Sequence, residues 1–328
     1  MPTTVELTLA CGDYEITRPL KDGTVRPDGI DLKVVTAMDS PTRHWRFLRN
    51  REFDMAEVSS SSYIAARDNG LPFRAVPVFP HRRFRHGFIF INTAKGISKP
   101  TDLIGRKVGT KGFLFTAGLW MRGILEHDYG VPHKSMHWLS EIDEDVDFTP
   151  PAGLDITQAP AGKSLEHMLV EGEIDALFSP DLIRPLTAGD KRVGRLFPSY
   201  KQEEIAFYRR TGIFPIMHVV GIKQEIVERH PWVAINLYKT FEKAKELAME
   251  RMENPRIVPL AWYRESWEEQ EKVLGKDPWE YGLGERNAKN FERLVTYSLE
   301  QGLSRRRLSL DELFLNVSEG RNRNEFRI

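Results

Sequence analysis

The sequence predicts an α/β protein with two lobes and a helical C-terminal part. Short apolar runs typical of buried strands alternate with amphipathic helical segments, and this alternation begins at the N-terminus and restarts near residue 95. After residue 222 the pattern is mostly helical. At 328 residues the chain is long enough for two domains of ordinary size, each with its own core.

The first lobe is expected to begin with a strand and to alternate strands with helices. Ser40 and Pro41 are typical of a helix start, with an N-cap and a proline at the first helical position, and the helix should run to about residue 50. Four serines, Ser59–Ser62, separate an apolar strand from the apolar run Tyr63–Ala66, which predicts strand, tight turn and helix. Strands are expected at 5–10, 29–35, 53–58 and 75–79.

The second lobe should repeat this pattern. Strands are expected at 107–110, 131–140 and 174–179, and helices at 113–128 and 163–171. Residues 141–147 carry five acids in seven positions and are expected to form a solvated loop. The apolar run 212–221 is interpreted as a strand that returns to the first lobe, and helices should follow at 223–228, 231–252, 263–274 and 286–301.

The lobes are therefore expected to comprise residues 1–90 (first lobe), 91–213 (second lobe) and 214–328 (return strand and C-terminal helices). Two segments, near 88–92 and 212–217, should cross between the lobes and leave a cleft. Open parallel sheets bind ligands at the carboxyl ends of their strands. The residues expected there are Asp13, Tyr14, Ser59–Ser62, Lys111–Thr116 and Ser179–Asp181.

Composition excludes several classes of function. Lys and Arg number 47, as do Asp and Glu, so no net charge draws the chain to nucleic acid or to an anionic membrane. The lone Cys11 excludes an internal disulfide, and no 18-residue apolar run occurs. The start of the sequence does not read as a leader peptide, so a cytoplasmic location is expected. Neither G-x-G-x-x-G nor the P-loop motif is present, so no nucleotide cofactor is expected. Whether the protein is a homo-oligomer is left open.

A basic cluster, His81–His86, is a candidate anion site. Arginine presents a planar fork that matches a carboxylate in two parallel hydrogen bonds. If the cluster is extended, His81, Arg83 and Arg85 share one face, and we favour this set over the alternate one. Ser60, Ser61 and Ser62 would add neutral donors at a helix start, where backbone N–H groups and the helix dipole favour an anion.

Each of these residues also has a structural interpretation. The basic residues are then a solvated loop, the serines only cap a helix, and Lys111 is an ordinary surface lysine. Lys111 and Thr116 are the candidate contacts from the second lobe. Tyr14 is the candidate contact that follows the first strand.

His86, His218 and Asp13 are the candidates for acid–base chemistry, since only imidazole titrates near pH 7 without perturbation. His218 has the apolar neighbours Ile216, Met217, Val219 and Val220, so a buried structural histidine is the alternative, and Asp13 is otherwise a turn-capping residue. The sequence has no H-E-x-x-H or C-x-x-C motif, so we expect no metal site. A divalent metal held by His81, His86 and His218 is the alternative.

Several stretches resemble one family, the 4,5-dihydroxyphthalate decarboxylases, which are related to type II periplasmic binding proteins. They include GDYEITRPL, FDMAEVSSSSYIAARDNG, FPHRRFRHGFIFIN, DLIGRKVGTKG, GEIDALFSPD and FPIMHVVGIKQEIVERHPWVA. Together with DPWEYGL and LEQGL near the C-terminus, they span nearly the whole chain in order.

The resemblance implies a two-lobe fold of the type II periplasmic-binding-protein kind, with two crossover segments. It also implies a carboxy-lyase of aromatic catabolism and phthalate degradation, which converts 4,5-dihydroxyphthalate to 3,4-dihydroxybenzoate and carbon dioxide. The alternative is a solute-binding protein of an ABC-type transporter that binds a small carboxylate without turnover.

Overall fold

The computed structural model describes residues 4–318, and the chain divides into two compact units. The first unit comprises the chain up to Arg82, the segment Ile216–Glu292 and the chain from Leu308. The second comprises Arg83–Pro215 and Arg293–Arg307. Residues 83–90, 214–215 and 293–307, which were expected in the first lobe, therefore group with the second unit.

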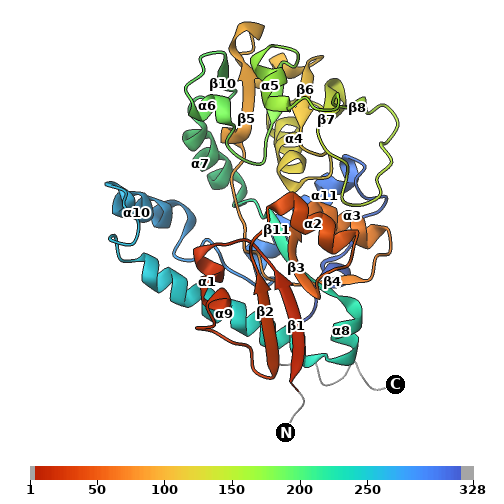
Figure 1. Ribbon diagram of the computed structural model, residues 1–328. Coiled ribbons are helices and arrows are strands. Elements are labelled where there is room, and N and C mark those ends of the chain that lie inside the picture. The colour runs from red at the N-terminus through yellow and green to blue at the C-terminus, as the bar shows by residue number, and fades with distance from the viewer. Residues whose placement is uncertain (1–3, 319–328) are drawn as a thin grey trace. The chain divides into compact units, whose positions relative to one another are not determined.

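Each unit is built from a sheet and helices, which confirms the α/β prediction (Figure 1). The strands are β1 (Val5–Ala10), β2 (Ile30–Val35), β3 (Met55–Ser59), β4 (Phe73–Val76), β5 (Ile89–Asn92), β6 (Lys107–Thr110), β7 (His137–Ser140), β8 (Ile156–Gln158), β9 (Ala176–Phe178), β10 (Val193–Arg195) and β11 (His218–Lys223). The α-helices are α1 (Arg18–Lys21), α2 (Ser40–Leu48), α3 (Ser60–Asp68), α4 (Thr116–Tyr129), α5 (Leu165–Val170), α6 (Arg184–Thr187), α7 (Tyr200–Thr211), α8 (Gln224–Arg229), α9 (Trp232–Met252), α10 (Tyr263–Leu274), α11 (Glu285–Glu300) and α12 (Leu310–Leu313).

The sheet of the first unit has the order β2-β1-β3-β11-β4. Strand β1 is parallel to β2 and to β3, whereas β11 is antiparallel to both of its neighbours, β3 and β4. The apolar run at 212–221 thus does return to the first unit, and it inserts its strand between β3 and β4. This register places His218 opposite Ser59, at the carboxyl end of β3.

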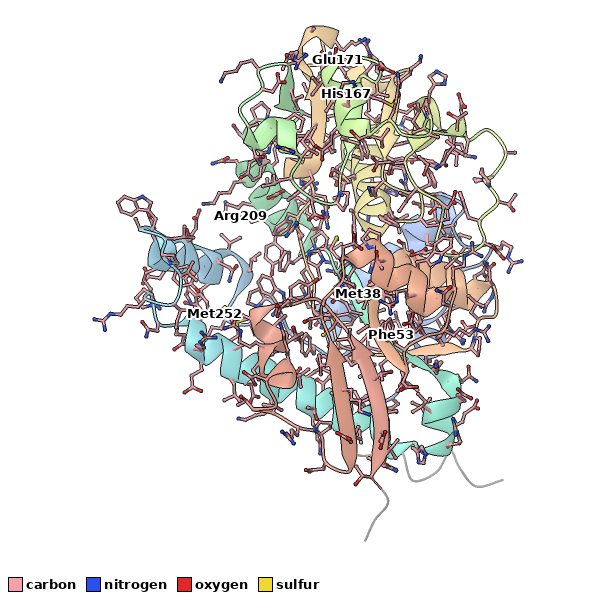
Figure 2. All side chains as sticks on the ribbon, viewed as in Figure 1. Met38, Phe53, His167, Glu171, Arg209 and Met252 are labelled. Atoms are coloured by element: carbon pink, nitrogen blue, oxygen red, sulfur yellow. The ribbon has the colours of Figure 1, made fainter. Side chains whose placement is uncertain are left out.

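Strand β3 passes directly into α3, as the run of serines predicts. All five residues of β3 are buried, and Ser59 is the N-cap whose hydroxyl accepts the N–H of Ser62. Phe53, labelled in Figure 2, precedes this strand, and its ring lies 4.9 Å from the guanidinium carbon of Arg46. Helix α2 packs against β3, and Arg43 and His44 are among the residues that this helix buries.

The sheet of the second unit has the order β10-β5-β9-β6-β7-β8. Strands β6, β7, β8 and β9 are mutually parallel, and β5 is antiparallel to β9 and to β10. In each sheet one strand thus runs against its neighbours. These two strands, β5 and β11, are the first that the chain forms after it passes from one unit to the other.

Two local expectations were wrong. Helix α2 is capped by Asp39, whose carboxylate accepts the N–H of Thr42, and not by Ser40, which is its first residue. The acidic segment 141–147 is not simply solvated, because Glu144 folds inward to accept the backbone N–H groups of Phe113 and Leu114 at 2.6 and 3.0 Å. Burial raises the pKa of Glu144. Among residues 4–318, no helix combines the length and apolar character needed to cross a membrane.

Candidate functional site

A buried carboxylate is the centre of the candidate site in the first unit. Glu57 lies in the middle of β3, is 0% exposed and has apolar neighbours along the strand. Charged side chains are almost never fully buried unless they are paired. The contacts of Glu57 therefore indicate what the strand is built to hold.

Four donors surround the two carboxylate oxygens of Glu57. Oε2 accepts the backbone N–H of Gly12 at 2.6 Å and lies 3.2 Å from Nη2 of Arg43. Oε1 accepts the hydroxyl of Tyr14 at 2.9 Å and lies 2.5 Å from Nδ1 of His218. A carboxylate offers about four lone-pair sites, so this set satisfies it.

The sheet register explains why Glu57 and His218 meet. Val220 is the direct partner of Glu57 across the β3–β11 pair, and His218 is the partner of Ser59. Because side chains alternate along strands, Glu57 and His218 lie on one face as diagonal neighbours. The pairing of β11 with β3 thus brings together two residues that are 161 positions apart in the sequence.

Two further histidines pack against His218. The ring centroid of His81 lies 4.7 Å away and that of His44 lies 5.0 Å away, both edge-on. The backbone carbonyl of His81 accepts the N–H groups of Met217 and His218, so the His81 segment is joined to the first residue of β11. His218 is 8% exposed, and His81 is half-buried.

The cluster favours an ionised Glu57. Burial alone would raise its pKa, but Arg43, His218 and the Gly12 N–H together hold the pKa of Glu57 well below its usual value. Burial lowers the pKa of His44 well below that of a free histidine, so His44 is neutral at pH 7. Burial, followed by the charge of Glu57, raises the pKa of Tyr14, which keeps its hydroxyl protonated as a donor.

Six of the predicted site residues lie in the first unit beside this cluster or at the start of α3. His218 and Tyr14 both contact Glu57, and His81 packs on His218. The remaining three are Ser60, Ser61 and Ser62, all fully buried. Ser60 donates its backbone N–H to Met217, so the start of α3 lies next to the start of β11.

The four serine hydroxyls differ in their contacts. The N-cap of α3 is Ser59, and its hydroxyl lies 3.2 Å from that of Ser61. The hydroxyl oxygens of Ser60 and Ser62 have no hydrogen-bond partner among the described residues. Buried hydroxyls are normally paired, so these two are candidates for a ligand contact, which stays a prediction.

Asp13 is not part of this cluster. Its carboxylate pairs with Lys21 at 2.7 Å, and its side chain is 56% exposed. The carboxylate that contacts His218 is that of Glu57, and not that of Asp13.

Arg83 and Arg85 belong to the second unit. Both guanidinium groups lie over the ring of Phe88, at 5.2 and 5.3 Å from its centroid. Arg83 pairs with Asp181 at 3.1 Å, and the buried Arg85 donates to the carbonyl of Pro180 at 2.7 Å. Their role as anchors for a carboxylate stays a prediction.

His86 also belongs to the second unit, where it is packed among aromatic rings. Its ring centroid lies 5.2 Å from that of Phe197, 5.6 Å from that of Phe207 and 6.1 Å from that of Tyr129. Burial lowers the pKa of His86 to about 4. A histidine that is neutral in an apolar setting is suited to packing, so the structure favours that interpretation over acid–base chemistry.

The last two predicted contacts, Lys111 and Thr116, belong to the segment that connects β6 to α4 and to the start of α4. Lys111 follows β6 and pairs with Glu141 at 2.6 Å. Thr116 is the first residue of α4 and is buried. Their contact with a ligand, and the predicted participation of both lobes in one site, stay predictions.

Glu57 and Arg43 were not found from the sequence. An available signal was the acid of Glu57 in an otherwise apolar strand, because a buried charge needs partners. Arg43 donates to the backbone carbonyl of Glu57 at 3.0 Å as well as pairing with its carboxylate. The partner itself had no signal, because the pairing depends on how α2 lies on β3.

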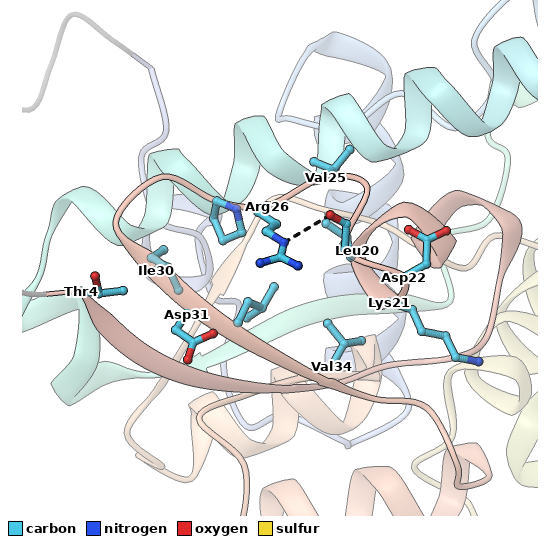
Figure 3. A pocket seen from close by; sticks show the side chains of 12 residues that line it. Thr4, Leu20, Lys21, Asp22, Val25, Arg26, Ile30, Asp31 and Val34 are labelled. Atoms are coloured by element: carbon cyan, nitrogen blue, oxygen red, sulfur yellow. Dashed lines mark hydrogen bonds between the residues drawn. The ribbon is translucent and has the colours of Figure 1, made fainter.

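A pocket of about 440 Å³ lies elsewhere in the first unit (Figure 3). It is lined by the loop that follows α1 and by β2, and Arg26 reaches into it while donating to the carbonyl of Gly23 at 3.3 Å. None of the predicted site residues lines this pocket. We therefore place the candidate site at the Glu57 cluster.

Relatives of the chain point to one kind of enzyme. A protein of Comamonas testosteroni named 4,5-dihydroxyphthalate decarboxylase is 34% identical over 319 residues, which cover 94% of this chain and 96% of that protein. This chain belongs to the 4,5-dihydroxyphthalate decarboxylase family. A Pseudomonas putida protein of the same name is 33% identical over 62% of this chain and 82% of its own length. Membership makes the chain an enzyme of the carboxy-lyase class that acts on a small molecule.

The fold of this decarboxylase-family chain is also that of solute-binding proteins, as the sequence resemblance implies. The model of the family described as NMT1/THI5 like matches residues 26–139. The periplasmic aliphatic sulphonate binding protein SsuA of Escherichia coli superposes with a TM-score of 0.57 at 13% identity, over 95% of this chain and 97% of that one. The alkanesulfonate-binding protein SsuA of Xanthomonas axonopodis pv. citri, bound to MOPS, gives 0.56 at 11% identity, over 94% and 98%. These similarities show the fold alone.

Proposed function

We propose that this enzyme decarboxylates 4,5-dihydroxyphthalate to 3,4-dihydroxybenzoate without oxidation, with His218 and His81 as its proton-transfer groups. The observation that carries this proposal is the contact of His218 with the ionised Glu57 and with the ring of His81. The shared name of two relatives supports the choice of substrate. The buried serine hydroxyls at the start of α3 provide neutral donors suited to a carboxylate.

The reaction needs two proton-transfer groups. Each carboxylate of the substrate is para to a hydroxyl, so removing the hydroxyl proton pushes electrons toward the carbon that bears the carboxylate. His218 accepts the phenol proton, and protonated His81 donates a proton to that carbon. The resulting dienone releases carbon dioxide, and the electrons of the broken carbon–carbon bond restore the aromatic ring as a phenolate. The phenolate takes its proton from His218, and a proton from the solvent restores protonated His81, so the reaction consumes one proton overall.

We also propose that the reaction needs no metal. Ligand atoms of Glu57, His81 and His218 lie within 4.8 Å of one another, which is a spacing that a metal ion could use. However, Glu57 already accepts four hydrogen bonds or ion pairs, so a cation would have to displace one of these donors. Treatment with a chelator should leave turnover unchanged, and activity that is lost on chelation and restored by a divalent metal would contradict this part of the proposal.

The first test measures carbon dioxide and 3,4-dihydroxybenzoate from purified protein and 4,5-dihydroxyphthalate. We expect the change His218→Gln to lower kcat by about 10²–10⁴-fold, the usual contribution of general acid–base catalysis. The change His167→Ala is the matched control, because His167 is an exposed histidine of α5 (Figure 2) and should leave kcat unchanged. Tight binding of the substrate by the unchanged protein without carbon dioxide release would instead favour the solute-binding alternative.

A further inference from the structure

The hydrogen bond between Glu57 and His218 determines which nitrogen of the imidazole carries the proton. An ionised carboxylate can only accept hydrogen bonds, so Nδ1 of His218, 2.5 Å from Oε1, must be the donor. In the neutral ring the lone pair is then on Nε2. We propose that Glu57 is a positioning residue that holds His218 in this tautomer, so that Nε2 is the nitrogen that takes the phenol proton. This inference rests on the proposed function.

Glu57 is held in place on every side of its carboxylate. Gly12 and Arg43 bind Oε2, and Tyr14 binds Oε1 beside His218. Arg43 and Glu57 are 1% and 0% exposed, so little water reaches the pair. A carboxylate fixed in this way needs no reorganisation when charge appears on the imidazole.

Neighbouring groups hold both the backbone and the ring of His218. Its backbone is fixed by β3 and by the carbonyl of His81. The rings of His44 and His81 pack on it edge-on. The charged and titratable groups that face His218 are therefore Glu57 from β3, Arg43 and His44 from α2, and His81, with Tyr14 joined through Glu57.

The change Glu57→Gln tests the positioning role. A glutamine has one acceptor oxygen, and the N–H groups of Gly12 and Arg43 both require it. The amide NH₂ would then face His218, whose Nδ1 would have to become the acceptor. We expect the proton to move from Nδ1 to Nε2, and kcat to fall by as much as about 10⁴-fold, as happens when a catalytic histidine is held in the wrong tautomer.

The direct measurement is ¹⁵N NMR of protein labelled in its histidines, with the His218 signals assigned by their loss in His218→Gln. We expect a protonated Nδ1 in the unchanged protein and a protonated Nε2 in Glu57→Gln. The acid limb of the kcat/KM profile should also move to lower pH, because the carboxylate no longer stabilises the imidazolium. A merely structural role for Glu57 would change neither the tautomer nor this profile.

A buried Arg43 without its charged partner destabilises the folded state, so a second variant carries Arg43→Met together with Glu57→Gln. Replacing both charges of a buried pair is tolerated far better than removing one. In this variant the Gly12 N–H still needs the glutamine oxygen as its acceptor, so the amide NH₂ again faces His218. We therefore expect the same move of the proton from Nδ1 to Nε2. The protonated Nδ1 persisting in a folded variant, with kcat unchanged, would overturn the inference.

The two proposals fail in different ways. The tautomer is read without substrate, so it does not depend on turnover. If the unchanged protein releases no carbon dioxide, the proposed function is wrong and the role of Nε2 in that reaction falls with it. If carbon dioxide release depends on His218 but not on Glu57, only the positioning role is wrong.

Discussion

Individual contacts in the candidate site depend on a close approach that only glycine permits. A Cβ built at Gly12 would lie 2.2 Å from Cζ of Tyr14, well inside any contact that real side chains make. The same Gly12 donates its N–H to Glu57. Gly12 therefore donates to one oxygen of the Glu57 carboxylate and leaves room for Tyr14, which donates to the other oxygen.

The change Gly12→Ala should displace the Tyr14 ring and lower the free energy of unfolding by about 1–3 kcal/mol, the usual cost of an overpacked buried position. Urea denaturation measures this cost. In a Tyr14→Ala background the clash has no partner, so the same glycine change should cost less than about 0.5 kcal/mol. Equal costs in the two backgrounds would show that the ring is not what limits position 12.

At the level of elements, helix α7 is joined to the segment that carries His86. Glu204 of α7 accepts the N–H of Gly87 at 3.1 Å, and Gly87 lies within the short 3₁₀ helix His86–Phe88. Burial raises the pKa of Glu204 from 4.5 to about 7, although the Gly87 N–H and Arg85 act in the opposite direction. Folding therefore stabilises the protonated, neutral form of the Glu204 carboxyl group.

This raised pKa makes stability depend on pH. Between about pH 4.5 and 7 the native state holds the Glu204 proton while the unfolded state releases it, so the free energy of unfolding falls as pH rises through this window. The loss should be about 1–3 kcal/mol, because one unit of pKa is worth about 1.4 kcal/mol. Urea midpoints measured from pH 4.5 to 7 should fall less in Glu204→Gln than in the unchanged protein. An identical slope in both proteins would exclude Glu204 as its cause.

At the scale of the whole molecule, the first unit is assembled from segments that are far apart in the sequence. Phe314 forms a parallel bridge with Ala75 of β4, and Tyr63 of α3 donates its hydroxyl to the carbonyl of Leu313. The ring of Phe314 packs on those of Phe79 and Phe291 at 5.8 and 4.7 Å. The C-terminal segment therefore completes the core of the first unit beside β4 and α3.

Removing this contact should destabilise the unit. We expect Phe314→Ala to lower the free energy of unfolding by about 3–5 kcal/mol, the range for deleting a buried phenylalanine side chain. The nearby exposed residue provides the control, so Asn316→Ala should cost less than about 0.5 kcal/mol. Chemical denaturation followed by circular dichroism compares the two, and equal small effects would show that the C-terminal segment is not part of the core.

Local patterns in the sequence were sufficient for most of the elements. The predicted strands at 5–10 and 107–110 and the helix at 263–274 match β1, β6 and α10 residue for residue. The serine run predicted the turn from β3 into α3, and the apolar run around His218 predicted a returning strand. These features depend on periodicity and capping, which involve residues close together in the chain.

The candidate site was only partly predictable, and the reason is sequence distance. His218 was a candidate because of its residue type within the predicted returning strand, and Tyr14 because it follows the first predicted strand. Their common partner, Glu57, became visible only when the antiparallel pairing of β11 with β3 set the register, and Arg43 only when α2 packed on β3. His86 has the same residue type as His218, but packing placed it among aromatic rings.

The amino-acid sequence by itself determined the α/β class and the family, and it supplied candidate residues for proton transfer and anion binding. The tertiary structure decided which of these residues share a carboxylate, because strand register and helix packing set contacts across 161 positions of chain. Composition and periodicity describe one segment at a time, whereas the protonation of a buried histidine is set by whichever charge lies against it in space.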